Sequence, residues 1–277
     1  MADAFRQYFV RGPKPEETNE TIKRYIAMLD DDVVKGSFFF SALFMQPKYS
    51  TPVTPSHYHP YSEVLFFQGL NPDKPEELGW EIDLYMGEEF ERHTITKTSL
   101  VYIPPRLVHC PIISRMKRPV FHIYSVTGPV DVINLFNGKV KQEGIFERHY
   151  DKNVLNGPKA GESRKEYKNC TTYLDDDVIK GSFHFASSFV SNDHPLQQQT
   201  AKSHPYGTVL GFFGIDPENQ FELGAEVEML MGDKLEKQTF NKSTVVFVPA
   251  GMKYCIAKTR VNRPFIFVER SSGPKLV

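Results

Sequence analysis

The chain has 277 residues, with 33 Lys and Arg against 34 Asp and Glu, and a formal net charge of −1. Hydrophobic residues make up 40% of the sequence, so a large core can form, and the length allows one large domain or two of about 130 to 140 residues. The near-neutral charge, with no basic run, argues against nucleic acid as a partner.

No segment has the composition of a signal peptide or a membrane span. Residues 1–6 lack an apolar core, and no apolar run reaches 18 residues. Cys110, Cys170 and Cys255 are widely spaced and form no CxxC pair, which favours reduced thiols. We therefore expect a cytoplasmic protein without a membrane partner.

Short apolar or alternating runs, separated by Gly, Pro, Asn and Asp, dominate the chain. Helical spacing appears at residues 16–29. Runs with the length of strands follow at residues 37–44, 63–67, 80–86, 99–103 and 120–126. This pattern predicts an all-β protein, a sandwich or barrel, with a few short helices.

The sequence contains an internal repeat with an offset of 145 residues. Residues 29–38, LDDDVVKGSF, recur as LDDDVIKGSF at 174–183, and the same offset relates HPY at 59–61 to HPY at 204–206. We predict an N-terminal extension (1–28), a first barrel (29–140), a linker (141–173) and a second barrel (174–277). The second barrel is expected to dock on the first, and the protein to form a homodimer.

Residues shared by the two halves are expected to serve folding, whereas residues found in one half are candidates for a task performed there. The Asp30–Asp32 run recurs at 175–177, so we interpret it as a turn feature. His57, Glu63 and His109 differ, because the second half has Lys202, Thr208 and Tyr254 at these positions, whereas His59 recurs as His204.

Strand parity brings three residues of the first half together. Side chains at i, i+2 and i+6 of a strand share a face, so His57, His59 and Glu63 can converge, with His109 supplied by another strand. Three imidazoles and a carboxylate suit one divalent ion, Fe, Mn, Ni, Zn or Cu. The second half, with a lone His204, is a poor metal site.

Both motifs of the first half resemble those of the cupins, proteins built on a double-stranded β-helix or jelly roll. His57, His59, Glu63 and Gly69 match the first motif, and Pro104 and His109 match the second. The sequence departs from the family at Arg106 and Thr98, where glycine is usual. The resemblance implies two tandem cupin-like barrels, a bicupin, with a metal site in the first copy only.

Three further residues are candidates for binding a small-molecule substrate. Arg106, beside His109, could bind a carboxylate or phenolate, or be a solvated loop charge. His122 and Tyr124 border the metal site if their face lines the barrel; the alternative is an outward face. Cys110 is expected to pack, because Cys255 matches it, and the other histidines, among them His93, His149 and His194, are assigned to surface or packing roles.

The resemblance implies a metal enzyme acting on a small organic acid or phenolic compound. We favour dioxygenation at Fe(II), because a six-coordinate ion with four protein ligands has two positions left for substrate and dioxygen. The alternatives are a metal-dependent isomerase or lyase, or a non-catalytic module that binds a metal or metabolite. No catalytic residue is assigned from the sequence.

Overall fold

The computed structural model describes residues 5–12, 25–47, 54–129, 134–136, 149–157, 170–193, 196 and 200–275. Regular structure in these residues is strand, apart from two short 3-10 helices, η1 (Arg6–Tyr8) and η3 (Asp151–Asn153). The all-β prediction is therefore confirmed. Among the described residues no helix is long and apolar enough to cross a membrane.

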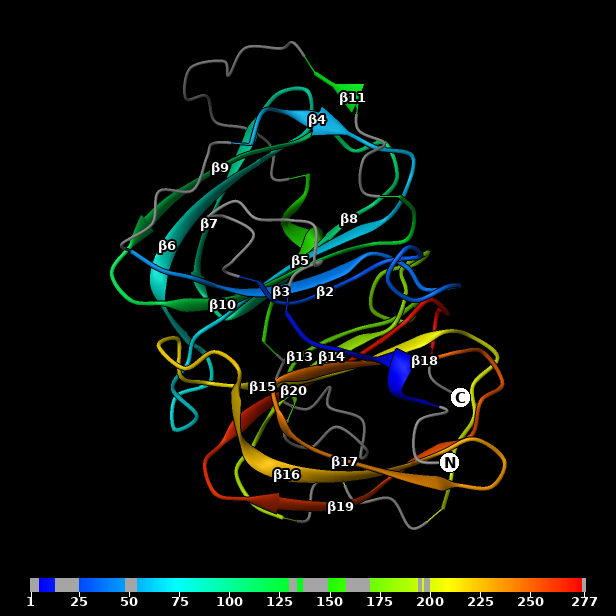
Figure 1. The fold of residues 1–277 in the computed structure, drawn as a ribbon. Helices are drawn as coiled ribbons and strands as arrows, with labels where there is room; N and C mark the ends of the chain where they lie inside the picture. Colours follow the sequence, from blue (N-terminus) through cyan, green and yellow to red (C-terminus); the bar gives the residue numbers. More distant parts are fainter. Residues whose placement is uncertain are drawn as a thin grey trace.

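The first barrel consists of an inner and an outer antiparallel sheet (Figure 1). Its inner sheet has the order β12 (Val154–Asn156), β8 (Ser99–Ile103), β5 (Glu63–Gln68), β10 (Val120–Val126), β3 (Phe40–Met45) and β2 (Tyr25–Leu29). Its outer sheet has the order β11 (Asn134–Leu135), β4 (His57–Tyr58), β9 (His109–Met116), β6 (Glu77–Met86) and β7 (Glu91–Lys97).

The second barrel repeats this plan, with three outer strands among the residues that the structure describes. Its inner sheet has the order β1 (Phe9–Val10), β18 (Thr244–Val248), β15 (Thr208–Gly214), β20 (Phe265–Ser271), β14 (Phe185–Val190) and β13 (Cys170–Leu174). Its outer sheet has the order β17 (Glu236–Lys242), β16 (Glu222–Met231) and β19 (Tyr254–Val261).

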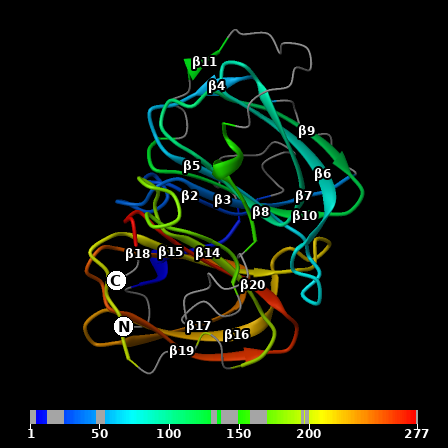
Figure 2. The same ribbon diagram turned by 180° about the vertical axis from the view of Figure 1, so that it is seen from behind.

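The two inner sheets pack against each other, so the sheets form four layers with three cores between them (Figures 1 and 2). Strand β5 shows why its sequence is continuously apolar. Val64 and Phe66 face the core between the barrels, whereas Leu65 and Phe67 face the interior of the first barrel. Glu63 shares the parity of Leu65, so its side chain belongs to that interior. The expected docking of the barrels is thus provided by their inner sheets.

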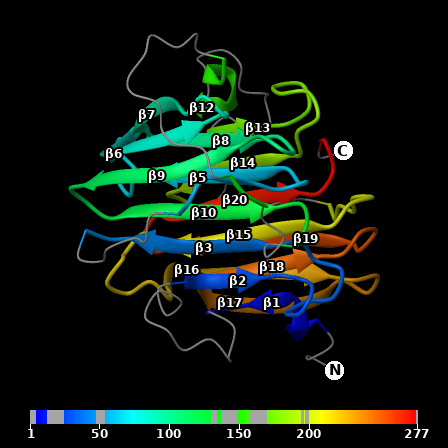
Figure 3. The same cartoon turned by 90° about the horizontal axis from the view of Figure 1, so that it is seen from above.

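Each barrel receives a short arm from the other half of the sequence. Strand β1 pairs with β18 of the second barrel, and β12 pairs with β8 of the first (Figure 3). The offset of 145 residues relates the arms as well, since Phe9 pairs with Val246 and Val154 pairs with Val101. Parts of the predicted extension and linker therefore complete the two inner sheets by reciprocal exchange.

The helical interpretation of residues 16–29 is wrong for its last five residues. Tyr25–Leu29 is strand β2, which pairs with β3, and Ile26 and Leu29 are fully buried in the core between the barrels. Burial on the inner sheet overrides the helical spacing of a short apolar run. Residues 16–24 lie outside the described part of the chain.

The repeated aspartates form turns, as predicted. Asp30 accepts hydrogen bonds from the backbone N–H groups of Asp32 and Val33, and Asp175 makes the matching contacts in the second half. Asp31 pairs with Lys35 at the surface. These contacts account for the repeated segment without a metal ion.

Candidate metal centre

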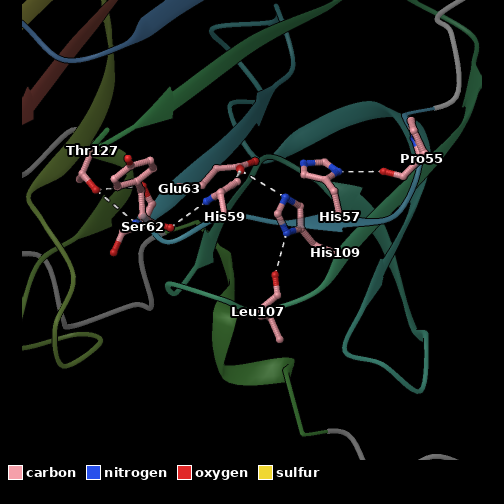
Figure 4. A network of polar contacts seen from close by, with 9 residues as sticks. Pro55, His57, His59, Ser62, Glu63, Leu107, His109 and Thr127 are labelled. Atoms are coloured by element: carbon pink, nitrogen blue, oxygen red, sulfur yellow. Dashed lines mark hydrogen bonds and ion pairs between the residues drawn. The ribbon is translucent and has the colours of Figure 1, made fainter. Parts of the chain in front are cut away.

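The four predicted ligands meet in the interior of the first barrel. His57 on β4 lies directly opposite His109 on β9, and the centroids of their rings are 4.3 Å apart. His59 follows β4, and Glu63 opens β5. All four side chains are buried, and one donor atom from each lies within 4.8 Å of the others (Figure 4).

The reason predicted for this convergence was wrong. His57, His59 and Glu63 do not share a strand, because the chain leaves strand geometry between Tyr58 and Glu63. The bend around Pro60 carries the chain from the outer sheet to the inner sheet, since β4 and β5 belong to different sheets. The ligands therefore approach from both walls of the barrel.

A backbone carbonyl fixes the orientation of each imidazole. The Nδ1 atoms of His57, His59 and His109 lie 2.8, 2.9 and 2.9 Å from the carbonyl oxygens of Pro55, Tyr61 and Leu107 (Figure 4). Because a carbonyl oxygen only accepts, these contacts favour a hydrogen on each Nδ1 and leave Nε2 of each ring as the candidate metal donor. Hydrogen bonds of this kind orient histidines for metal binding.

Glu63 supplies the negative charge beside these three rings. Its Oε2 atom lies 2.5 Å from Nε2 of His59 and 3.2 Å from Nε2 of His109. Burial raises the pKa of Glu63, but the attraction of His109 and His59 outweighs burial and lowers the pKa to about 2. Burial lowers the pKa of His57, and the proximity of His109 lowers it further. Glu63 is thus ionised, and His57 is neutral, at physiological pH.

These residues fit one divalent ion. Three imidazole nitrogens and one carboxylate are the donors that borderline divalent metals prefer, and an ionised carboxylate with neutral rings is the state that binds a cation. The Nε2 atoms of His59 and His109 both face the carboxylate of Glu63, so a divalent ion could bind between these donors. His57, His59, Glu63 and His109 could therefore hold one metal ion.

Solved structures with the same architecture support this description of the fold. A mutant of Bacillus subtilis oxalate decarboxylase OxdC superposes with a TM-score of 0.57 at 11% sequence identity, over 91% of this chain and 73% of that chain. The fold is that of a bicupin. A structure of the same protein described for its Mn(II) centres gives a TM-score of 0.57 at 12% identity, with the same coverage.

AerE from Microcystis aeruginosa is another structural match, with a TM-score of 0.53 at 12% identity over 96% of this chain and 98% of that chain. No family model and no curated protein sequence matches the chain. At these identities the structural likeness establishes the fold, and the four ligands rest on the geometry of this chain.

The two departures from the cupin motifs preserve the local backbone. Arg106 adopts φ +66°, close to the φ +76° of its counterpart Gly251, and its N–H donates to the carbonyl of His59 at 2.8 Å. The hydroxyl of Thr98 accepts a hydrogen bond from the N–H of Gly69 at 3.2 Å, and Ser243 does the same for Gly214. The backbone of the turn that precedes His109 is therefore the same in both barrels, and Arg106 adopts a conformation there that is strained for a residue with a side chain.

His122 and Tyr124 line the interior of the first barrel, so the alternative that they face outward is wrong. Val120 and Tyr124 belong to or pack against the interior core, whereas Phe121 and Ile123 face the other barrel. His122 stacks on Phe67, with ring centroids 4.6 Å apart. Burial lowers the pKa of His122 to about 4, and burial raises the pKa of Tyr124. Both side chains are neutral at physiological pH.

The second barrel of this bicupin has different chemistry at the matched positions. The Nε2 atom of His204 lies 3.1 Å from the hydroxyl of Tyr254, and that hydroxyl donates to Glu269 at 3.3 Å. Across the residues that the structure describes, the groups able to hold a metal all lie in the first barrel. Lys202 and Thr208 replace two of the four ligands.

Sequence reasoning missed the anchoring carbonyls and a second polar cluster. Pro55, Tyr61 and Leu107 each lie two residues from the histidine that they orient, a spacing that side-chain patterns do not reveal. His93 and His149, assigned to surface or packing roles, belong to the second cluster. Cys110 is buried and outside the ligand group, as expected, and His194 lies outside the described residues.

Proposed function

We propose that the chain is a mononuclear metal-dependent enzyme that acts on a small organic acid or phenolic compound, and that its reaction is a dioxygenation at Fe(II). The observation that carries this proposal is the convergence of three oriented imidazoles and one ionised carboxylate in the first barrel, a group that the described residues of the second barrel lack. A bound divalent ion with four protein ligands supplies open positions for substrate and dioxygen.

The neighbouring side chains favour oxygen chemistry over isomerisation. An isomerase or lyase needs a group that exchanges a proton near neutral pH. His122, with a pKa of about 4, stays neutral and does not exchange a proton near neutral pH, and burial suppresses ionisation of Tyr124. These two residues are therefore suited to shaping the pocket and excluding water, whereas the reactivity comes from the bound ion.

Arg106 supports an anionic substrate. It is exposed and adopts a left-handed backbone conformation that costs a non-glycine residue about 1 kcal/mol. The second barrel, without the four ligands, has glycine here. A strained backbone conformation next to a binding site often has a functional reason. A guanidinium can form paired hydrogen bonds with a carboxylate or bind a phenolate.

A lyase is the second candidate function, because the solved structures with this fold include oxalate decarboxylase, described with Mn(II) centres. Decarboxylation of a small dicarboxylic acid would use the same four ligands and Arg106. A non-catalytic bicupin that binds a metal or metabolite is the remaining alternative.

Oxygen uptake and anaerobic turnover distinguish these functions. The metal-free protein is loaded with Fe(II) or with Mn(II) and assayed against phenols, keto acids and dicarboxylic acids. We expect oxygen consumption with the Fe(II) form. Release of carbon dioxide under anaerobic conditions would instead establish a lyase, and metal binding without turnover of any compound would favour the non-catalytic module.

Matched controls come from the second barrel. His57→Lys and His109→Tyr introduce the residues found at the equivalent positions, which the fold already accommodates there. Both variants are expected to bind about one metal ion fewer than the parent and to lose the activity, while keeping the circular dichroism spectrum of the parent. A variant that bound as much metal as the parent would remove the basis of the proposal.

A further inference from the structure

A second group of imidazoles and carboxylates lies in the first barrel, apart from the four ligands. Glu91 and His93 lie on β7, with both side chains on its buried face. His149 and Asp151 lie on the arm that leads into β12, and Glu89 precedes β7. Donor atoms of Glu91, His93 and Asp151 lie within 4.8 Å of one another, as do those of Glu89, Glu91 and His149.

Glu91 connects the strand to the arm. Its carboxylate accepts hydrogen bonds from the backbone N–H groups of His149 at 2.9 Å and Tyr150 at 3.4 Å. Its Oε1 atom lies 2.7 Å from Nε2 of His93, and Nδ1 of His93 lies 3.4 Å from Oδ1 of Asp151. The cluster therefore joins β7 to the exchanged arm through both side-chain and backbone contacts.

The cluster carries an excess of negative charge. Three carboxylates face two imidazoles, so the net charge is negative whether the rings are neutral or protonated. The neighbouring phenol responds to this field, because burial and then the proximity of Glu89 and Glu91 raise the pKa of Tyr150 to about 12. A bound cation would neutralise the charge.

The cluster is also open to a metal ion on one side. Glu91 and His93 are buried, whereas the side chains of Asp151 and His149 are 47% and 57% exposed. An ion can therefore reach the buried donors from solvent past the exposed ones. A mixture of imidazole nitrogens and carboxylate oxygens is a donor set that zinc and related divalent ions prefer.

The second barrel provides a comparison at the same positions. The offset of 145 residues matches Glu89, His93 and Asp151 to Lys234, Gln238 and Arg6. Two acidic residues are replaced by basic ones and the imidazole by an amide. Glu91 has a counterpart in Glu236, which fits a structural contact with the arm. Among the residues that the structure describes, the second barrel therefore lacks the donors of this cluster.

We propose that Glu91, His93 and Asp151, together with Glu89 and His149, form a second divalent metal site of the zinc class that fastens the exchanged arm to the first barrel. The site is separate from the metal centre. In the outer sheet, His109 pairs with Met86 and Met86 pairs with Glu91, so Glu91 lies two strands away from the nearest metal-centre ligand. One chain therefore binds two metal ions.

Equilibrium dialysis of the metal-free protein against zinc chloride, followed by elemental analysis, tests the proposal. We expect about two zinc ions per chain for the parent and about one for the single variants His93→Gln and Asp151→Arg, which carry the residues of the second barrel. The double variant His57→Lys/His109→Tyr removes the metal centre and should retain about one ion. Combining it with His93→Gln should leave none.

The outcomes separate the two sites. Loss of all zinc from the His57→Lys/His109→Tyr protein would overturn the second site while leaving the proposed function intact. Retention of two ions by both His93→Gln and Asp151→Arg would overturn it as well. Asp151 is half exposed, so Asp151→Arg is expected to fold even if His93→Gln does not, and zinc should raise its melting temperature less than that of the parent.

Discussion

The Nε2 atom of His59 lies 2.5 Å from Oε2 of Glu63, although both atoms are hydrogen-bond acceptors when the ring is neutral. The carbonyl of Tyr61 holds the ring hydrogen on Nδ1, so Nε2 has no proton to offer unless the ring is charged. Glu63 is ionised because its pKa is held at about 2. This contact needs a shared cation, either a proton or a metal ion.

Replacing the carboxylate by an amide tests that relationship. In Glu63→Gln the amide nitrogen can donate to Nε2 of His59, so the metal-free variant should be at least as stable as the metal-free parent. In the Asp151→Arg background, which lacks the proposed second site, the protein with Glu63 should gain about 2.7 kcal/mol of unfolding free energy when free metal is about 100 times Kd, and the protein with Glu63→Gln should gain almost none. Thermal unfolding with and without metal measures both, with the exposed Glu81→Gln as control. An equal gain in Glu63→Gln would contradict the assignment.

Arg106→Gly separates the strain at this position from the role of the guanidinium. Glycine adopts φ +66° without a steric cost, so the variant should be more stable by about 1 kcal/mol in urea unfolding. If the guanidinium binds an anionic substrate, KM should rise at least tenfold while metal content stays the same. Arg106→Lys keeps the charge, so its KM should lie between those of the parent and Arg106→Gly. An unchanged KM in Arg106→Gly would make Arg106 a surface residue.

The repeat made most of the fold predictable, and the repeat together with the cupin motifs identified the four side chains that converge in the first barrel. Comparing the halves isolated His57, Glu63 and His109 because each has a chemically different counterpart. Exchange of the arms was missed because a strand of two or three residues is too short for periodicity to reveal. A signal was present, since GPK at 12–14 recurs at 157–159, and Gly12 and Gly157 both have positive φ.

The second cluster could not be predicted for a related reason. Glu91 and His149 are 58 residues apart and meet only because the arm folds back along the first barrel. Sequence spacing indicates shared faces within one strand, but it does not indicate which distant segment completes a sheet. The bend near Pro60 was missed for the same reason: the sequence predicted one strand through His57, His59 and Glu63, whereas the structure has two strands in different sheets.

The exchanged arms should stabilise their barrels separately. Phe9 packs on Phe240 of the second barrel, and Val10 is buried between the barrels, so Phe9→Ala/Val10→Ala should cost about 3 kcal/mol. Hydrogen exchange should accelerate in β18, the strand that pairs with β1, and not in β8. Val154→Ala/Leu155→Ala is the matched control and should accelerate exchange in β8. Equal changes in both strands would contradict separate stabilisation.

Arg270 is a buried cation whose replacement should not weaken the fold. Its side chain is fully buried with the guanidinium carbon 3.4 Å from the ring centroid of Phe38 and 4.1 Å from that of Phe183. Its three nitrogens have no hydrogen-bond partner among the described residues, and burial lowers its pKa. Arg270→Met should therefore be neutral or stabilising by about 1 to 4 kcal/mol in urea unfolding.

Arg270→Ala serves as the control for that prediction, because it removes the packing as well as the charge and should be destabilising. A loss of more than about 2 kcal/mol in Arg270→Met would contradict the prediction. It would mean that the guanidinium has a bound anion or ordered water between the barrels.

Glu269 should make the stability of the protein depend on pH. It lies inside the second barrel, with a side chain 14% exposed, and burial raises its pKa from 4.5 to about 6. Between these two pH values the folded state binds more protons than the unfolded state, so stability falls as pH rises. Above about pH 6 the loss of stability caused by ionised Glu269 is constant. The rise of its pKa from 4.5 to about 6 corresponds to a loss of about 2 kcal/mol. Glu269→Gln removes the charge and keeps an oxygen that can accept from Tyr254.

The variant should therefore be more stable than the parent by about 2 kcal/mol at pH 7 to 8, and this advantage should shrink to almost zero below pH 4.5. Urea unfolding of both proteins at several pH values between 4 and 8 measures the difference. The exposed Glu226→Gln is the control and should show no such trend. A constant difference across this range would mean that Glu269 has the same pKa in the folded and unfolded states, and that its contact with Tyr254 and the charge of Lys202 offset burial completely.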